Sequence, residues 1–81
     1  MTNLEQEKYE THDIYLAAYF KLSGCRMVER NRQGRRVIFV FENPGGTMRE
    51  MREAYYSGQG KVVAKQFADE IIAMKQLCFD P

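Results

Sequence analysis

The side chains best suited to bind a ligand are arginines gathered in one short segment of the chain. Five arginines and one glutamate, a net charge of +4, lie within residues 26–36. Guanidinium groups pair well with phosphate oxygens and with guanine edges, and a two-stranded ribbon fits a duplex major groove. The segment is therefore a candidate nucleic-acid-binding site, at Arg30, Arg32, Arg35 and Arg36. A solvated turn is the favoured interpretation, because charges at a hairpin also discourage edge pairing between chains.

Groups that could perform catalysis are few and scattered. The single histidine, His12, adjoins Asp13 at an expected helix start, where an exposed side chain is the simpler interpretation. Glu50 and Glu53 could act as a carboxylate pair, but the arginines beside them favour a solvated, salt-bridged face. Catalysis needs a nucleophile, a base and a group that orients the base. The sequence therefore predicts no catalytic residue and no enzyme, unless a cleft gathers His12 with a carboxylate or with Cys25.

Metal and cofactor sites are not predicted either. Cys25 and Cys78 lack any metal-ligand spacing, and one histidine adds too little to complete a zinc site. In a reducing compartment both thiols are expected to be buried and unpaired. The Gly45-Gly46-Thr47 segment at a helix start offers amides to an anion, yet it lacks the lysine of a phosphate-binding loop. A plain loop is therefore favoured there.

A nearly apolar helix is expected just before the arginine segment. Thr11 is a candidate N-cap, residues 14–22 are good helix formers, and Ser23-Gly24 ends them. The only charged residue within residues 14–22 is Lys21. A helix that is apolar all round is packed on more than one side.

Two short strands flank the arginine turn. Residues 25–30 and 36–42 are separated by a polar stretch with Gly34, whose positive φ suits a tight hairpin. Strict alternation along the first strand places on one face Arg26, Val28 and Arg30. The second strand is apolar on both faces, with Val37, Phe39 and Phe41 on one and Ile38 and Val40 on the other. Such a strand must be covered on both faces.

Two further helices complete the predicted order. Thr47 and Glu50 match a capping box, with Asn43-Pro44 as the competing start, and Ser57-Gly58 ends that helix. A last helix over about residues 64–77 follows the i, i+3, i+4, i+7 pattern. The predicted fold class is α+β in the order α-β-β-α-α, an antiparallel hairpin packed against three helices.

Length and hydropathy bound the remaining choices. The 81 residues suffice for one domain, predicted over residues 11–79 after a flexible lead-in at residues 1–10. The longest apolar run, residues 37–41, is far below the roughly 20 residues that cross a bilayer, and the polar start predicts no signal peptide. We therefore expect a cytoplasmic protein with no membrane partner.

The doubly apolar second strand carries the leading functional prediction. A domain of this size buries only about 60 % of the surface of its unfolded chain, so self-association would add to a marginal core. One hairpin and three helices are too few to cover both faces of the strand. The sequence predicts a small, non-enzymatic assembly domain that forms a homodimer, extending the hairpin to a four-stranded sheet. The predicted interface is Val37, Ile38, Phe39, Val40 and Phe41.

A family resemblance accompanies these patterns. Thr11 and Asp13 open an apolar helix, Gly24 follows, and residues 34–42 read G-x-R-V-x-F-x-F-E. The combination resembles a family of short bacterial and phage domains of unknown function over about residues 8–77. The sequence departs from it at Val63, where a polar cap of the last helix is expected. The resemblance implies a fold and no activity, and the alternative function is a nucleic-acid-binding accessory module of a phage or mobile element.

Overall fold

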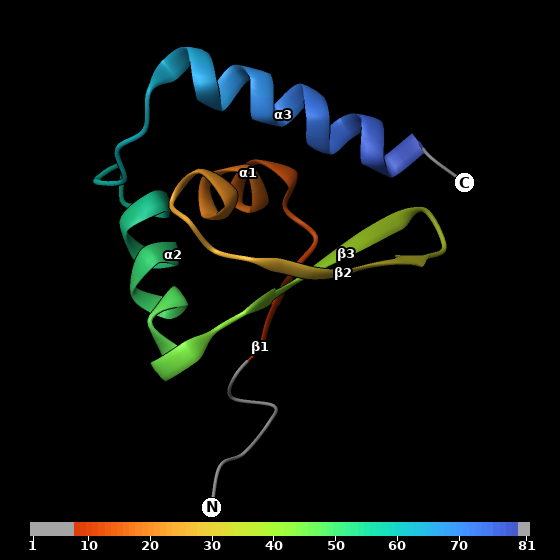
Figure 1. The fold of residues 1–81 in the computed structure, drawn as a ribbon, viewed down its shortest axis with the longest axis horizontal. Helices are drawn as coiled ribbons and strands as arrows, with labels where there is room; N and C mark the ends of the chain where they lie inside the picture. The colour runs from red at the N-terminus through yellow and green to blue at the C-terminus, as the bar shows by residue number, and fades with distance from the viewer. Residues whose placement is uncertain (1–7, 80–81) are drawn as a thin grey trace, which may run out of the picture.

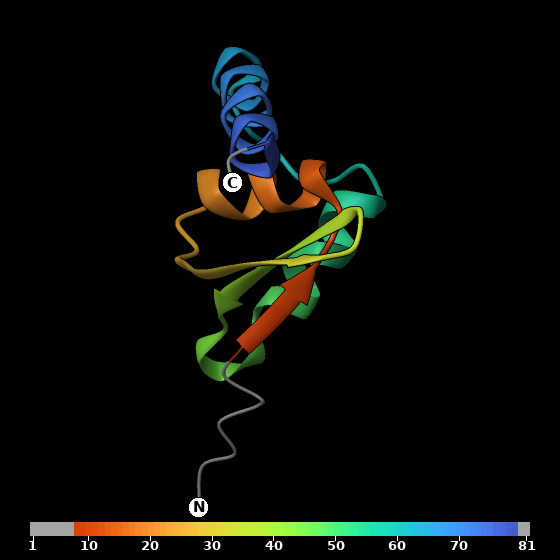
Figure 2. The same ribbon diagram turned by 90° about the vertical axis from the view of Figure 1, so that its right-hand side faces the viewer.

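Three layers of secondary structure lie one above another (Figures 1 and 2). The computed structural model describes residues 8–79, with a sheet as the first layer, helix α1 (Ile14–Leu22) as the second and helix α3 (Ala64–Phe79) as the third. Helix α2 (Met48–Tyr56) follows a 3-10 turn, η2 (Pro44–Gly46), and packs against α1. The sheet is antiparallel, with β1 (Lys8–Thr11), β3 (Arg36–Glu42) and β2 (Met27–Gln33) in that spatial order. The α+β class is confirmed.

Strand β1 corrects the predicted order of elements. The order is β-α-β-β-α-α rather than α-β-β-α-α. Residues 8–10, expected in a lead-in, pair with β3, as Tyr9 does opposite Phe41, and Thr11, expected as an N-cap, pairs opposite Phe39. A segment of four residues with a single large apolar side chain, that of Tyr9, is too short to show a period-2 pattern. Backbone pairing with β3 forms the strand instead. Residues 1–7 of the predicted lead-in lie outside the described residues.

Helix α1 is packed on two sides, as its all-round apolar composition predicts. The sheet covers one side and α3 the other (Figure 2). The helix starts at Ile14 because Asp13, and not Thr11, is its N-cap. The Asp13 carboxylate accepts hydrogen bonds from the amides of Tyr15 at 2.9 Å and Leu16 at 3.2 Å. The predicted end is confirmed, with Ser23 as C-cap and Gly24 at a φ of 94°.

The predicted interface strand, β3, occupies the centre of the sheet. Val37, Phe39 and Phe41 belong to the core, whereas Ile38 and Val40 point to the opposite face. Val40 is only 1 % exposed, and Ile38 is half-buried. Both edges of β3 are paired within the chain, by β1 and by β2. Homodimerisation stays a prediction, and in this fold a sheet could be extended only from the outer edge of β1 or of β2.

Helix α2 begins where the capping box places it but is capped differently. Thr47 is the N-cap residue, yet its side chain makes no capping hydrogen bond. The Asn43 side-chain oxygen accepts the hydrogen bond from the Met48 amide, at 3.0 Å, and Asn43 is itself buried. Both predicted starts therefore contribute: Thr47 is the N-cap residue, and the turn η2 places Asn43 where its side chain accepts the hydrogen bond from the Met48 amide.

Candidate nucleic-acid interface

The tip of the β2–β3 hairpin is a two-residue turn made of Gly34 and Arg35. Gly34 has a φ of 62°, and within the described chain positive φ values occur at glycines alone. Glycine at the first position followed by a residue of negative φ is the pattern of a type II′ turn, which matches the twist of paired strands. The turn therefore holds Arg35 and Arg36 at the tip in a fixed register.

A bulge in β2 decides which way its arginines face. The register slips between Met27 and Glu29, so Met27 opposes Phe41 while Arg30 opposes Phe39. The extra residue, Val28, reverses the alternation that follows it. The predicted grouping of Val28 with Arg30 on one face is therefore wrong for this strand, because a sequence period cannot reveal an inserted residue.

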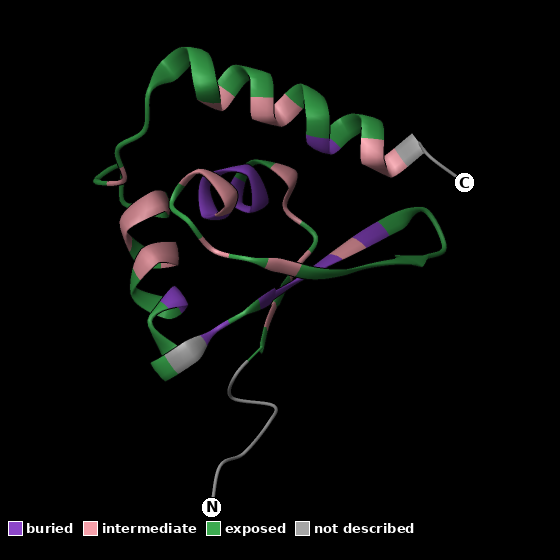
Figure 3. Cartoon of the chain, in the orientation of Figure 1, coloured by how far each residue is buried: buried purple, intermediate pink, exposed green. Residues whose placement is uncertain are grey.

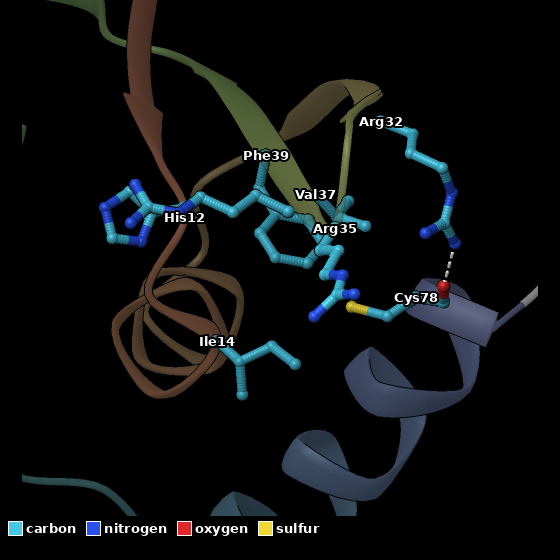
Figure 4. A pocket seen from close by; sticks show the side chains of 8 residues that line it. His12, Ile14, Arg32, Arg35, Val37, Phe39 and Cys78 are labelled. Atoms are coloured by element: carbon cyan, nitrogen blue, oxygen red, sulfur yellow. Dashed lines mark hydrogen bonds between the residues drawn. The ribbon is translucent and has the colours of Figure 1, made fainter.

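After the bulge, the arginines of β2 share the helix-facing side of the sheet. Arg30 and Arg32 lie opposite Phe39 and Val37, both of which are buried in the core. The Arg32 guanidinium donates a hydrogen bond to the carbonyl oxygen of Cys78 near the end of α3 (Figure 4). The strand β2 is otherwise exposed almost throughout (Figure 3).

A groove opens between the hairpin tip, the start of α1 and the end of α3. Its volume is about 430 Å³. Three of the predicted binding residues, Arg32, Arg35 and Arg36, line it, and Figure 4 shows Arg32 and Arg35 directed toward the end of α3. The remaining walls are His12, Ile14, Val37, Phe39 and Cys78. The groove thus combines cationic groups with apolar walls.

The fourth predicted residue, Arg30, borders a second hollow. This hollow has a volume of about 350 Å³ and is also lined by Met27, Val28, Glu29 and Leu77. Because Leu77 and Cys78 are consecutive, both hollows border the last turn of α3. The structure therefore brings all four arginines to one region.

Within residues 8–79, no carboxylate neutralises these arginines. Ion pairs within residues 8–79 join Lys21 with Glu70, Arg26 with Glu42, Arg52 with Glu53, and Lys65 with Asp69. Arg30, Arg32, Arg35 and Arg36 take part in none of them, and all four are exposed. No ion pair within residues 8–79 therefore competes with an external anion for these four guanidinium groups.

The residues that could perform catalysis are not brought together. His12 lines the groove, but its ring lies on the opposite side of Phe39 and Val37 from Cys78 (Figure 4). Cys25 is elsewhere, with its Sγ 3.8 Å from Met51 Sδ, and burial raises the pKa of its thiol. Among the described residues, no cluster of three His, Cys, Asp or Glu side chains could hold a metal ion.

The tyrosines that could stack on bases are engaged elsewhere. Tyr9 packs edge-on against Phe20 with ring centroids 5.3 Å apart. Tyr55 packs against Tyr19 and Tyr56. The Tyr56 hydroxyl donates a 2.6 Å hydrogen bond to Asp13, which raises its pKa to about 12. The contacts of Tyr55 and Tyr56 tie α2 to α1 and to its N-cap.

Comparison with known proteins identifies the family. A family model described as a domain of unknown function, DUF5659, matches residues 6–80. The chain belongs to this family. Membership confirms the resemblance to a family of unknown function, whereas the bacterial or phage source and the two motifs stay predictions. No curated protein and no solved structure matches the chain.

Sequence reasoning missed the walls of the groove. Ile14 and Cys78 are 64 positions apart and meet the hairpin only through the packing of α3 on α1. No local pattern marks such a meeting; the one available signal is the apolar stripe of residues 64–78, which requires a partner helix.

Within the described chain, no helix is long and apolar enough to span a membrane.

Proposed function

We propose that this domain binds nucleic acid through Arg30, Arg32, Arg35 and Arg36 and acts by binding rather than by catalysis. The observation that carries the proposal is the gathering of four exposed arginines, unpaired within residues 8–79, around the end of α3. A phosphodiester backbone supplies the regular negative charge that such a group neutralises. The net charge of +1 adds little attraction, so this local cluster must provide it.

The binding test uses fluorescence anisotropy with labelled DNA over a range of salt concentrations. The variant Arg32/Arg35/Arg36→Ala is expected to bind at least about tenfold more weakly at low salt, since each arginine loses charge-assisted hydrogen bonds. The slope of log affinity against log salt should become shallower by about two units. Unchanged affinity in this variant would reject the site.

A matched control separates this site from general positive charge. The variant Arg49/Lys61/Lys65→Ala also removes three positive charges, but from exposed residues of α2, of the loop after it and of α3. At physiological salt, where long-range attraction alone is largely screened, its affinity should remain within about threefold of the parent protein. Equal losses in both variants would contradict a localised site.

Self-association is the second candidate, and the outer face of the sheet favours it. Helices α1 and α3 both lie on one face, and the opposite face carries half-buried Ile38 at the middle of β3. Val28, 38 % exposed, lies at the bulge of the edge strand β2. Light scattering coupled to size exclusion tests the homodimer. A monomeric mass at micromolar concentration would reject it.

A further inference from the structure

We infer that the nucleic acid bound is a single strand that lies along the helix-facing side of β2, past the end of α3. This inference rests on the proposed function of the same arginines and specifies its ligand. It differs from the sequence-based expectation, in which the hairpin enters the major groove of a duplex. The direction of the arginines, the size of the hollows and the chemistry of their walls support it.

The first step concerns the two faces of β2. Arg30 and Arg32 project on the side of Phe39 and Val37, which is the side that α1 and α3 cover. The outer face carries Glu29 opposite Val40, Asn31 opposite Ile38 and, beside the turn, Arg36 opposite Gln33. A ribbon that entered a major groove with its open face would present Glu29 and Asn31 to the phosphates, with Arg36 as the one arginine of the four on that face. Arg30 and Arg32 would point away from such a duplex, so the open face offers little of the charge that duplex binding requires.

The second step concerns space. The hollows of about 430 Å³ and 350 Å³ fall in the range of about 300–1,000 Å³ typical of small-ligand pockets. They suit one or two nucleotides, whereas a duplex has a major groove that alone is about 12 Å wide. Both hollows are bordered by the last turn of α3, one at Cys78 and the other at Leu77, and that turn limits the access of a rigid duplex. A flexible strand can bend around that turn and place phosphates in each.

The third step concerns the walls. Proteins that bind single strands combine a positive track for the backbone with surfaces on which the bases pack. Here Arg30, Arg32 and Arg35 form the track, while Ile14 and the exposed ring of His12 offer packing surfaces at the groove. Duplex bases are stacked on one another and cannot use such walls.

The contact between Arg32 and α3 fits this arrangement. In the free protein, the Arg32 guanidinium donates to the Cys78 carbonyl. A phosphate oxygen is charged and accepts a stronger hydrogen bond than a neutral carbonyl. A bound strand therefore replaces the carbonyl as the acceptor, and Arg32 is already oriented toward the last turn of α3, which borders both hollows.

The test compares a labelled 12-nucleotide single-stranded DNA with the duplex of the same sequence by fluorescence anisotropy. The single strand is expected to bind at least about tenfold more tightly at equal salt. Equal or tighter duplex binding that still depends on the arginines overturns this inference and leaves the proposed function standing. If the parent protein binds neither the single strand nor the duplex, both this inference and the proposed function are refuted.

Two pairs of variants test where the bound nucleic-acid strand lies. Arg32→Gln and Asn31→Asp each lower the charge by one unit at adjacent residues on opposite faces. We expect about a tenfold loss of single-strand affinity for Arg32→Gln and less than twofold for Asn31→Asp. Cys78→Trp fills the groove without changing charge, and Gln76→Trp is its control at an exposed position of the same helix.

Cys78→Trp should weaken single-strand binding about tenfold, and Gln76→Trp should not. Circular dichroism confirms that each variant is folded. If Cys78→Trp does not fold, the pair at residues 31 and 32 decides, because both positions are exposed. Equal effects of Arg32→Gln and Asn31→Asp would overturn the placement on the helix-facing side.

Discussion

Helix α1 and strand β2 have opposite relations to the core. Five of the nine residues of α1 are buried, between the sheet and α3, whereas six of the seven residues of β2 are exposed. Both elements lie close to β3, so proximity to the core does not explain the difference. The composition does, because α1 is almost entirely apolar and β2 is charged. Stability therefore depends on α1 and on the buried residues of β3, and the proposed binding depends on β2 and the hairpin tip.

The largest expected effect on stability is in the α1–sheet contact. Phe20 is fully buried, and its ring centroid lies 5.3 Å from that of Tyr9 and 5.4 Å from that of Phe41. Phe20→Ala should lower the free energy of unfolding by about 3–5 kcal/mol, through lost burial and a residual cavity. Urea denaturation measures it. A loss below about 1 kcal/mol would show that α1 does not anchor the fold.

A smaller loss is expected at the start of α1. Asp13→Ala removes the acceptor for the amides of Tyr15 and Leu16 and for the Tyr56 hydroxyl. The expected cost is about 1–2 kcal/mol, as for other N-cap removals. Asp13→Asn is the control, since asparagine also caps helices and should retain most of the stability. Equal losses in both variants would mean that charge, and not capping, is responsible.

The Tyr56 hydroxyl should give α1 a stability term that depends on pH. Its pKa is raised from the ordinary 10 to about 12, first by the hydrogen bond to Asp13. A folded pKa above the unfolded one means that the stabilisation is complete below pH 10 and is lost as the pH rises toward 12. Urea denaturation at pH 9 and pH 11.5 should show a smaller decline for Tyr56→Phe than for the parent. Identical declines would refute the coupling.

The smallest effect on stability is expected from the groove arginines. Arg32/Arg35/Arg36→Ala should change the free energy of unfolding by no more than about 0.5 kcal/mol, because the three side chains are exposed and unpaired with carboxylates in the described chain. Urea denaturation under the conditions used for Phe20→Ala provides the comparison. A loss of 2 kcal/mol would mean that the Arg32 contact with Cys78 holds α3 in place, and the separation of stability from binding would fail.

Sequence patterns were sufficient where a local signal and the tertiary contact agree. The C-terminal end of α1 follows from Ser23-Gly24, and the hairpin follows from Gly34 between its two strands, whereas the N-cap of α1 was expected at Thr11 and is Asp13. Strand β1 was missed because Tyr9 alone carries its contact with the core. The direction of Arg30 was missed because the inserted residue Val28 leaves no mark on the composition.

The groove shows the same limit at longer range. The four arginines are evident as a charge cluster, and their residue types already suggest an anionic ligand. Cys78 joins them only because α3 packs on α1 and ends above the hairpin. Contacts between residues far apart in the chain depend on how whole helices pack, and no window of the sequence contains that information.

The central position of β3 also has a consequence for the route of folding. Its pairs with β2 join residues 3 to 14 positions apart, from Gln33 with Arg36 to Met27 with Phe41. Its pairs with β1 join residues 28 to 34 positions apart, from Thr11 with Phe39 to Lys8 with Glu42. Closing the longer loop costs more chain entropy, so the hairpin is expected to form before β1 docks. Until β1 arrives, one edge of β3 is unpaired, and a β1 segment from a second chain can occupy it as readily as the chain's own, which is the condition for strand exchange at high concentration.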